Sequence, residues 1–256
     1  MNMVDLTLLW PPLLAGVVVL STHVPLGRQV LKRGIIFIDL AVAQLAGLGV
    51  ILIHLLIDQP PGWTVQSVAF MTAATGSLGL RWAERHWGDV LEAIIGVVFI
   101  LAVTAALILL ANDPHGGDRL KDLLAGQLLW VSYEDLWLPA ILSLGILAFW
   151  FKSNVTNQST LFYGLFALSV TMSVQLVGVY LVFASLIVPA LATRHRQGLA
   201  FAYGVGMAGY LLGLMLSALL DLPTGPIVVW AMALIAVVTA FSDQFVIKRK
   251  GETNNL

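Results

Sequence analysis

Polar side chains interrupt or end the first hydrophobic stretches of the chain, and these residues are the first candidates for chemistry. Asp39 and Gln44 lie inside the stretch 35–57, and His23 lies in the latter part of the stretch 8–26. His54 and Asp58 are four residues apart and are predicted to share one face of a helix. Ionisable groups inside apolar spans are costly and are functional candidates by default. Oxygen and imidazole ligands of this kind suit zinc or manganese.

Each of these residues also has an ordinary structural interpretation. Asp39 is only about one helical turn from the inner boundary of its stretch, so it could extend to that boundary or pair with Lys32 or Arg33. A single histidine at the outer end of a span, such as His54, is often an interfacial residue. Gln175, near the end of the stretch 161–176, is a further polar residue of this kind. Spacing alone leaves both a metal pathway and a structural role open.

Sets of residues that would support an enzyme are missing from the sequence. It contains no Gly-x-x-x-x-Gly-Lys-Ser/Thr loop, no Gly-x-Ser-x-Gly elbow, no His-Glu-x-x-His helix and no cysteine. The histidines are scattered singly along the chain. The 13 Lys and Arg residues nearly balance the 14 Asp and Glu residues, so no strong field favours nucleic acid. We therefore expect no catalytic residues.

Composition predicts the elements that must position these polar groups. The 256 residues are 59% hydrophobic and only 11% charged, with a mean hydropathy of +0.92, which is typical of a polytopic membrane protein. At about 20 residues per crossing, the chain makes about nine spans in an all-α bundle. We expect a single domain over residues 1–256. The spans are predicted at 8–26, 35–57, 63–80, 90–110, 136–151, 161–176, 179–193, 199–220 and 227–247.

The basic residues predict the orientation of these spans. With nine spans, 11 of the 13 Lys and Arg residues fall on one side, and only Arg119 and Lys121 fall on the other. By the positive-inside rule, the N-terminus is then outside and the C-terminus is cytoplasmic. Merging the sixth and seventh spans would give eight and break this alternation.

Two further segments carry alternatives that the sequence leaves open. The connection 112–135 contains apolar residues at helical spacing, which favours an interfacial helix or a re-entrant segment that lines a pathway. In the eighth stretch, Gly209 and Gly213 form a Gly-x-x-x-Gly pair. This pair predicts close helix packing, with packing inside the chain favoured over a dimer contact.

Several blocks in order resemble the permease family of zinc, manganese and iron ABC importers, as a divergent branch. They are Pro25-Leu-Gly27, the block 37–44 (FIDLAVAQ), the block 123–136 (LLAGQLLWVSYEDL), the block 177–194 (VGVYLVFASLIVPALATR) and the block 221–226 (DLPTGP). Together these blocks cover most of the chain. Any single block is weak, whereas the ordered set is specific.

The resemblance implies a permease subunit that moves a divalent metal ion by alternating access. It implies a homodimer in the plasma (inner) membrane, a separate cytoplasmic ATP-binding subunit that hydrolyses ATP, and an extracytoplasmic metal-binding protein. The chain itself would hold no cofactor; the metal is cargo, with zinc expected first and manganese or iron next. Two alternative functions remain open. One is a proton-coupled carrier that uses Asp39, and the other is a membrane assembly subunit that transports nothing.

Two features depart from the family's usual pattern. Family members carry an Asp and, four residues later, a His in the second span; here Gln44 stands at the position of that His, and Asp39 is five residues before it. By resemblance, Asp39 and Gln44 would contact the metal, and His23, His54 and Asp58 would lie along the pathway.

The second departure concerns the contact with the ATPase. The cytoplasmic segment 152–160 is shorter than in many members and lacks their acidic residue and glycine. We therefore expect the ATPase to contact the connection 81–89 instead, through Arg81, Trp82, Arg85 and Trp87. The tryptophans have an alternative place at the level of the lipid headgroups.

Overall fold

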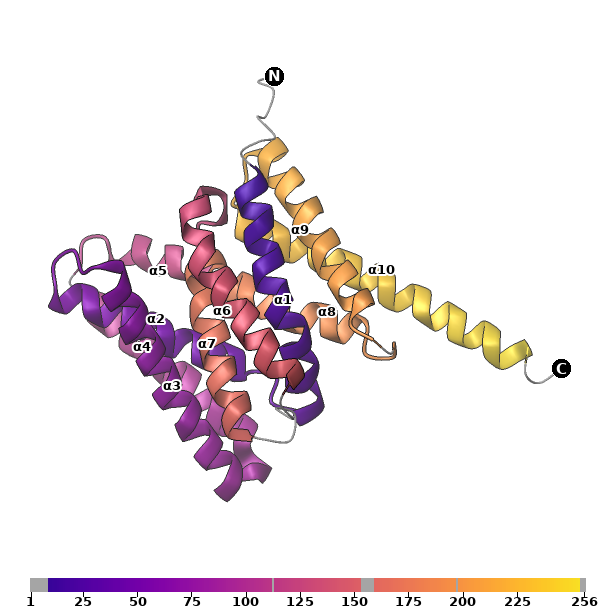
Figure 1. Cartoon of the computed structure of the whole chain (residues 1–256), viewed down its shortest axis with the longest axis horizontal. Helices are drawn as coiled ribbons and strands as arrows, with labels where there is room; N and C mark the ends of the chain where they lie inside the picture. The colour runs from indigo at the N-terminus through magenta and orange to yellow at the C-terminus, as the bar shows by residue number, and fades with distance from the viewer. Residues whose placement is uncertain (1–8, 112, 153–158, 197, 254–256) are drawn as a thin grey trace.

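The described parts of the chain fold into helices joined by turns. The computed structural model describes residues 9–111, 113–152, 159–196 and 198–253, and no strand occurs within these ranges (Figure 1). The long helices are α1 (Trp10–Arg33), α2 (Ile38–Leu56), α3 (Gly62–His86), α4 (Leu91–Leu110), α6 (Tyr133–Lys152), α7 (Ser159–Val177), α8 (Val179–Ala192), α9 (Ala200–Leu220) and α10 (Thr224–Thr253). The short ones are η2 (Gly88–Val90), α5 (Gly116–Ala125) and η3 (Leu128–Trp130).

A helix lies at every stretch that hydropathy predicts, so the all-α fold is confirmed. Among the described residues, 6 helices are long and apolar enough to cross a membrane: α1, α2, η2 with α4, α6, α7 and α9. α8 and the part Thr224–Ala240 of α10 are apolar but shorter, and α3 is not among the 6. The count of nine spans, their orientation and the single domain stay predictions.

The helices that continue past the ends that hydropathy predicts include α1 and α3. α1 continues through Pro25 to Arg33 and ends at Gly34, whose left-handed conformation (φ 69°) lets its N–H bond the carbonyls of Leu31 and Val30. α3 continues to His86. The basic residues at 28–33 and 81–85 therefore lie on helices and not in the inner connections where we expected them. Hydropathy ends a span at its first charges, whereas backbone hydrogen bonding continues until a cap stops it.

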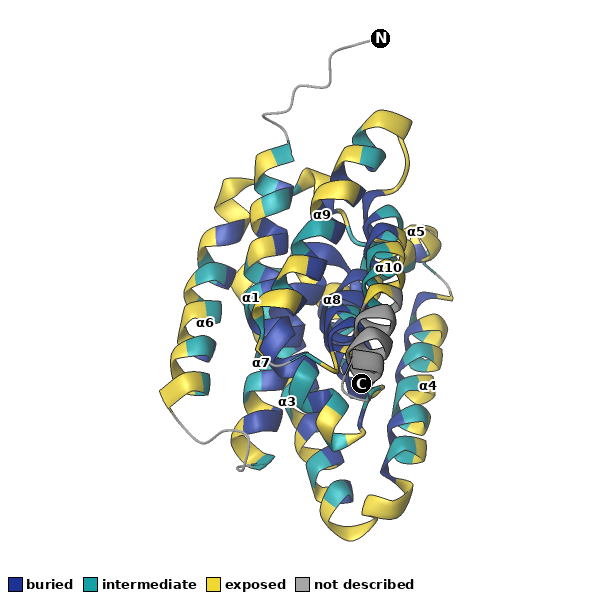
Figure 2. Ribbon diagram, turned by 90° about the vertical axis from the view of Figure 1, so that its right-hand side faces the viewer, coloured by how far each residue is buried: buried dark blue, intermediate teal, exposed yellow. Residues whose placement is uncertain are grey.

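The core lies around α7 and α8, and two helices lie at its edge. Within the apolar window of α7, 67% of the residues are buried inside the chain, whereas only 17% are buried in α6 and 22% in the window of η2 and α4. Figure 2 shows α4 and α6 with mostly exposed or half-buried residues on the outside of the bundle. The C-terminal part of α10 continues beyond the other helices (Figure 1). Ser169, Thr171 and Ser173 of α7 are thus enclosed by the chain itself.

The Gly-x-x-x-Gly pair of α9 packs against α10. A Cβ atom on Gly213 would lie 2.4 Å from the Cα of Val228, and one on Gly209 would lie 2.7 Å from the Cβ of Met232. Only glycine permits so close an approach. Packing inside the chain, the favoured alternative, is therefore confirmed.

The segment after α5 enters the bundle at the break between α7 and α8. Gly126 (φ 72°) and Gly178 (φ 79°) both adopt the left-handed region, and their main chains touch. A Cβ on Gly126 would lie 2.3 Å from the carbonyl oxygen of Val177, and one on Gly178 would lie 2.3 Å from the nitrogen of Gly126. Leu128 is fully buried just beyond. α5 itself has mostly exposed or half-buried residues, whereas the segment after it packs inside the bundle.

Candidate functional site

Asp39 lies in the first turn of α2 and is completely buried. Neither of its carboxylate oxygens has a hydrogen-bond partner among the described residues. The alternative in which Asp39 pairs with Arg33 is not what the structure shows. Arg33 instead reaches Glu84 of α3 (3.5 Å) and lies over the ring of Phe162 (4.4 Å). A buried carboxyl group without a partner is costly, which makes Asp39 a strong functional candidate.

Gln44 is also buried, with 2% of its surface exposed, one and a half turns further along α2. Residues five apart on an α-helix point about 140° away from each other. Asp39 and Gln44 therefore lie on different faces of α2, in contrast to the family's spacing of four, which places the Asp and the His on one face.

His23 forms the end of a small polar cluster between α1 and α7. Its Nδ1 lies 3.0 Å from the carbonyl oxygen of Val19 and 3.2 Å from the hydroxyl of Thr22, which accepts a hydrogen bond from Ser169 (2.8 Å). Because the carbonyl of Val19 can only accept, Nδ1 carries the proton in the neutral ring. The buried Nε2 has no partner among the described residues. This nitrogen therefore keeps a lone pair that can accept a proton or bind a metal.

The expectation that His54 and Asp58 share a helix face is wrong. α2 ends at Leu56, and Ile57 is extended (φ −131°, ψ 124°). Pro60 and Pro61 follow, and a proline disfavours helical conformation in the residue before it. Of the two residues, only His54 lies on the helix, and its Nδ1 is 2.8 Å from the carbonyl oxygen of Val50. Asp58 is exposed beyond the helix end.

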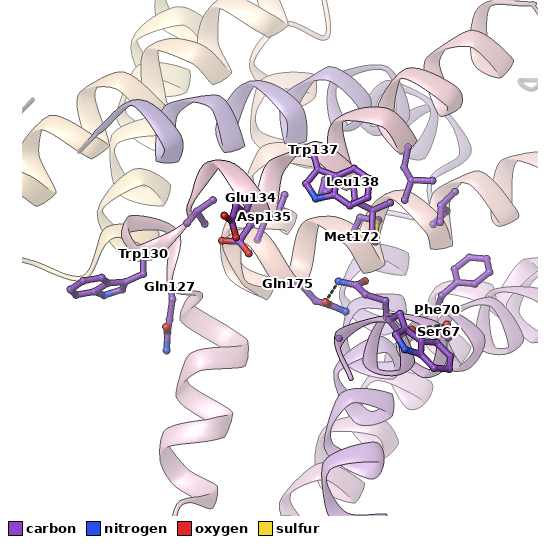
Figure 3. A pocket seen from close by; sticks show the side chains of 18 residues that line it. Ser67, Phe70, Gln127, Trp130, Glu134, Asp135, Trp137, Leu138, Met172 and Gln175 are labelled. Atoms are coloured by element: carbon purple, nitrogen blue, oxygen red, sulfur yellow. Dashed lines mark hydrogen bonds between the residues drawn. The ribbon is translucent and has the colours of Figure 1, made fainter. Parts of the chain in front are cut away.

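Two cavities lie beside α7. The larger, of about 820 Å³, lies between α3, α6, α7 and η3 (Figure 3). The smaller, of about 410 Å³, lies between α2, α3, α5 and α7. The polar side chains of the larger cavity are Gln66, Ser67, Gln127, Glu134, Asp135 and Gln175. Those of the smaller are His54, Arg119, Asp122, Gln127 and Gln175. His54 is thus the one predicted pathway residue that lines either cavity, and Gln127 and Gln175 line both.

Sequence reasoning missed most of the polar residues in these cavities. Gln66 of α3 and Gln175 of α7 are hydrogen-bonded, with the Nε2 of Gln66 donating to the Oε1 of Gln175; the dashed line in Figure 3 marks this bond. Gln66 carried the same signal as Gln175, a polar side chain inside an apolar stretch. Their pairing was invisible because α3 and α7 are far apart in sequence.

Arg81, Trp82, Arg85 and Trp87, expected at the ATPase contact, lie at the C-terminal end of α3. The ring of Trp82 lies 4.6 Å from that of His86 and 4.9 Å from that of Trp87, with an edge-on geometry for the second pair. The two tryptophans are 53% and 48% exposed. Most of the short segment 152–160 (residues 153–158) lies outside the described residues. The α3 end therefore offers an exposed aromatic and basic surface.

The ends of α1, α3, α4 and α7 are joined near this surface. Besides its contacts with Glu84 and Phe162, Arg33 donates a hydrogen bond to Ser159 (3.3 Å). Glu92 accepts a hydrogen bond from the backbone N–H of Ile36 (2.7 Å), which ties the α1–α2 turn to α4. These contacts close this end of the bundle.

A ready-made cage for a metal ion is not found among the described residues. No group of three or more His, Asp or Glu side chains comes together there. Asp39, His23 and Gln44 are each buried, and the polar side chains that line the cavities are amides, carboxylates, Ser67, His54 and Arg119.

Known proteins similar to this chain are membrane proteins of transport systems. A probable metal transport system membrane protein of Chlamydia trachomatis is 26% identical over 273 residues, covering 94% of this chain and 89% of that protein. The high-affinity zinc uptake system membrane protein ZnuB of Haemophilus influenzae is 23% identical over 261 residues, covering 93% and 98%.

A solved structure has the same fold. The structure of PsaBC from Streptococcus pneumoniae in complex with Fab matches with a TM-score of 0.74 at 18% identity, over 92% of this chain and 91% of that chain. The sequence itself matches the family described as the ABC 3 transport family over residues 5–155 and 152–243. Since these matches extend over most of its length, the chain belongs to the ABC 3 transport family.

Proposed function

We propose that this chain is the membrane-spanning permease subunit of an ATP-driven importer of a divalent metal cation. Membership of the ABC 3 transport family and the names of its relatives support transport of a metal. The observation that carries the proposal is the buried carboxyl group of Asp39, which has no partner among the described residues. A bundle that served only as a scaffold would gain nothing from such a group, whereas a cation pathway needs one.

The metal that we propose first is zinc, because one relative is named as part of a zinc uptake system, with manganese or iron next. Asp39 supplies carboxylate oxygens, Gln44 an amide carbonyl and His23 an imidazole nitrogen. Zinc accepts nitrogen and oxygen ligands of these kinds, and manganese favours the oxygens. The metal is the transported substrate in this proposal, and no cofactor is required of this chain.

The transport mechanism that we propose is alternating access. The cavities beside Gln175 give access from one end of the bundle, while the contacts of Arg33 with Glu84 and of Glu92 with Ile36 close the other end. Import requires the first end to close and the second to open around the ion. Binding and hydrolysis of ATP on a separate subunit would supply the difference in free energy between these arrangements.

The surface at the end of α3 is the proposed contact with that ATPase. Trp82 and Trp87 are half-exposed large side chains next to Arg85, a combination common at the energetic centre of interfaces. Glu84 of the same helix contacts Arg33, so this helix would lie at the closed end of the proposed pathway. Movement of α3 by the ATPase would therefore act directly on that end.

The orientation in the inner membrane follows from the basic residues. The closed end with Arg33 and Arg85 would face the cytoplasm, and the cavities would face an extracytoplasmic metal-binding protein. Reporter fusions after Asp58, Asn112 and Asp221 should read outside, and fusions after Arg85 and Lys250 should read inside. A cytoplasmic signal after Asp221 would contradict the nine-span topology.

Reconstitution tests the function and its alternatives together. The permease would be placed in liposomes with and without its partner ATPase, and uptake of Zn²⁺ and Mn²⁺ would be measured with and without ATP. Uptake that requires both the ATPase and ATP supports the proposal. Uptake driven by a proton gradient alone would replace it with a secondary carrier. An assembled complex that hydrolyses ATP without uptake of either metal would indicate an assembly subunit.

A further inference from the structure

We propose that the side-chain carbonyls of Gln66 and Gln175 form a binding site for a divalent cation where the two cavities meet. Gln127 lines both cavities beside this pair and is the third candidate ligand. The proposal rests on the proposed function, because it gives the cargo a stopping point between the cavities and the buried Asp39. It concerns residues outside the Asp and His positions of the second span.

The position of the pair is set by the packing of α3 on α7. Gln66 lies on the first turns of α3 and Gln175 on the last turn of α7, and the two amides are in direct contact. Gln175 lines the cavity on each side of it. An ion that enters either cavity therefore meets the same pair of side chains.

The exposure pattern of α7 shows that Gln175 faces open space. Val174 and Leu176, its neighbours in the chain, are buried, whereas Gln175 is exposed. An amide in an apolar helix normally has its polar atoms satisfied. Here the Oε1 of Gln66 is buried with no partner among the described residues, although the Nε2 of the same amide bonds Gln175. One carbonyl oxygen of the pair is thus unpaired beside the cavities.

The charges around the pair favour a cation. Glu134 and Asp135 lie on the wall of the larger cavity, and no Lys, Arg or His is among its lining residues. Arg119, the basic residue of the smaller cavity, lies with its Nε 3.2 Å from a carboxylate oxygen of Asp113. The larger cavity therefore carries a net negative charge, and Asp113 and Asp122 offset the charge of Arg119 at the smaller one.

The chemistry of the ligands sets the class of ion. Amide carbonyls are neutral, hard oxygen donors. Mn²⁺ and similar ions prefer such oxygens to soft ligands such as thiolates. When an ion arrives, the amide of Gln66 turns so that its carbonyl, and no longer its N–H, faces Gln175, and both oxygens replace water on the ion. Neutral ligands bind weakly enough to release the ion again, which a transport site requires.

Equilibrium binding of Mn²⁺ alone to the purified full chain in detergent tests the site. The Asp39→Asn variant is the background, so that the buried carboxylate does not contribute. Gln175→Leu and Gln66→Leu should each weaken Mn²⁺ binding at least about tenfold. Loss of a group that merely supports a metal ligand already costs about tenfold in affinity, and loss of a ligand should cost no less. Gln175→Glu should tighten binding, because it adds a negative charge at the same position.

The matched control is Ser67→Ala. Ser67 lines the same cavity, but its hydroxyl bonds the carbonyl oxygen of Trp63 in its own helix, so Mn²⁺ binding should not change. Thermal unfolding of each variant shows whether it is folded. If the pair had only a structural role, Gln175→Leu and Gln175→Glu would both disturb it and would act in the same direction. Weaker Mn²⁺ binding in Gln175→Leu and tighter binding in Gln175→Glu therefore identify a ligand. Unchanged binding in folded Gln175→Leu, or no Mn²⁺ binding in the Asp39→Asn background, would overturn the site.

Transport separates failure of this site from failure of the proposed function. If the wild-type chain with its ATPase takes up no metal in liposomes, the proposed function is wrong, whatever the amides bind. If the wild type takes up Mn²⁺ and Gln175→Leu does so equally well, the function stands and the site is wrong. The proposal expects uptake by the wild type and a loss of at least tenfold at low Mn²⁺ for Gln175→Leu.

Discussion

Replacing Asp39 by asparagine separates a cation-binding role from a structural role more cleanly than any other single change. The side chain is fully buried, and its two oxygens have no partner among the described residues. Asparagine has nearly the same shape but no charge. The substitution therefore removes the group that can carry a negative charge and breaks no hydrogen bond or ion pair observed among the described residues.

The expected effects of this substitution on the free energy of unfolding and on metal affinity differ widely. Since no hydrogen bond is lost, the free energy of unfolding should change by less than about 1 kcal/mol, compared with about 3–5 kcal/mol when a buried ion pair is broken. A carboxylate about 4 Å from a unit charge contributes about 4 kcal/mol at an effective dielectric constant of 20. For a divalent ion this attraction doubles, so even the value for a unit charge, nearly a thousandfold in metal affinity, is a lower bound on the loss.

The assay measures uptake of Zn²⁺ and Mn²⁺ at low concentration in liposomes that contain the ATPase, beside thermal unfolding in detergent. Asp221→Asn is the matched control, because Asp221 is exposed in a turn and its left-handed conformation (φ 53°) is one that asparagine tolerates. We expect uptake to fall at least a hundredfold in Asp39→Asn and to be normal in the control. Normal uptake by Asp39→Asn, or its unfolding in detergent, would refute the reasoning.

Further changes test the other parts of the structure. Gln44→His introduces a softer imidazole ligand and should shift metal preference toward zinc in competition uptake; an unchanged preference would place Gln44 off the pathway. On α9, Gly213→Ala should cost about 1–3 kcal/mol of unfolding free energy, because its Cβ would meet the main chain of Val228, whereas Gly204→Ala, with nothing within 4 Å, should be neutral or stabilising by up to about 1 kcal/mol. Equal effects at the two glycines in thermal unfolding would contradict this packing. Trp82→Ala with Arg85→Ala should weaken co-purification with the ATPase, and full retention of the ATPase would exclude this surface.

The helices could be predicted from sequence because each apolar stretch is long and bounded by charges or by Gly and Pro. Helix ends were harder, since they depend on single caps. Gly34 ends α1 well after its first charged residue. α2 ends before Asp58, and Pro60 and Pro61 follow shortly after that end. The second of these ends could have been predicted, because proline restricts the residue before it.

The candidate site was only partly predictable, because its contacts join distant parts of the chain. Sequence identified Asp39 and Gln44 by their polarity alone. It suggested Arg33 as a partner for Asp39 on the basis of proximity, but Glu84, about fifty residues further on, binds Arg33 instead. The bond between Gln66 and Gln175 likewise depends on the packing of α3 on α7. No local pattern contains information of this kind.

The contact between Gly126 and Gly178 has a mechanical consequence. Side chains that separate two backbones can change rotamer and absorb a small displacement, but here one main chain rests directly on the other. The α5–η3 segment and the junction of α7 and α8 cannot approach each other further at this point, so a displacement of one toward the other would have to move both.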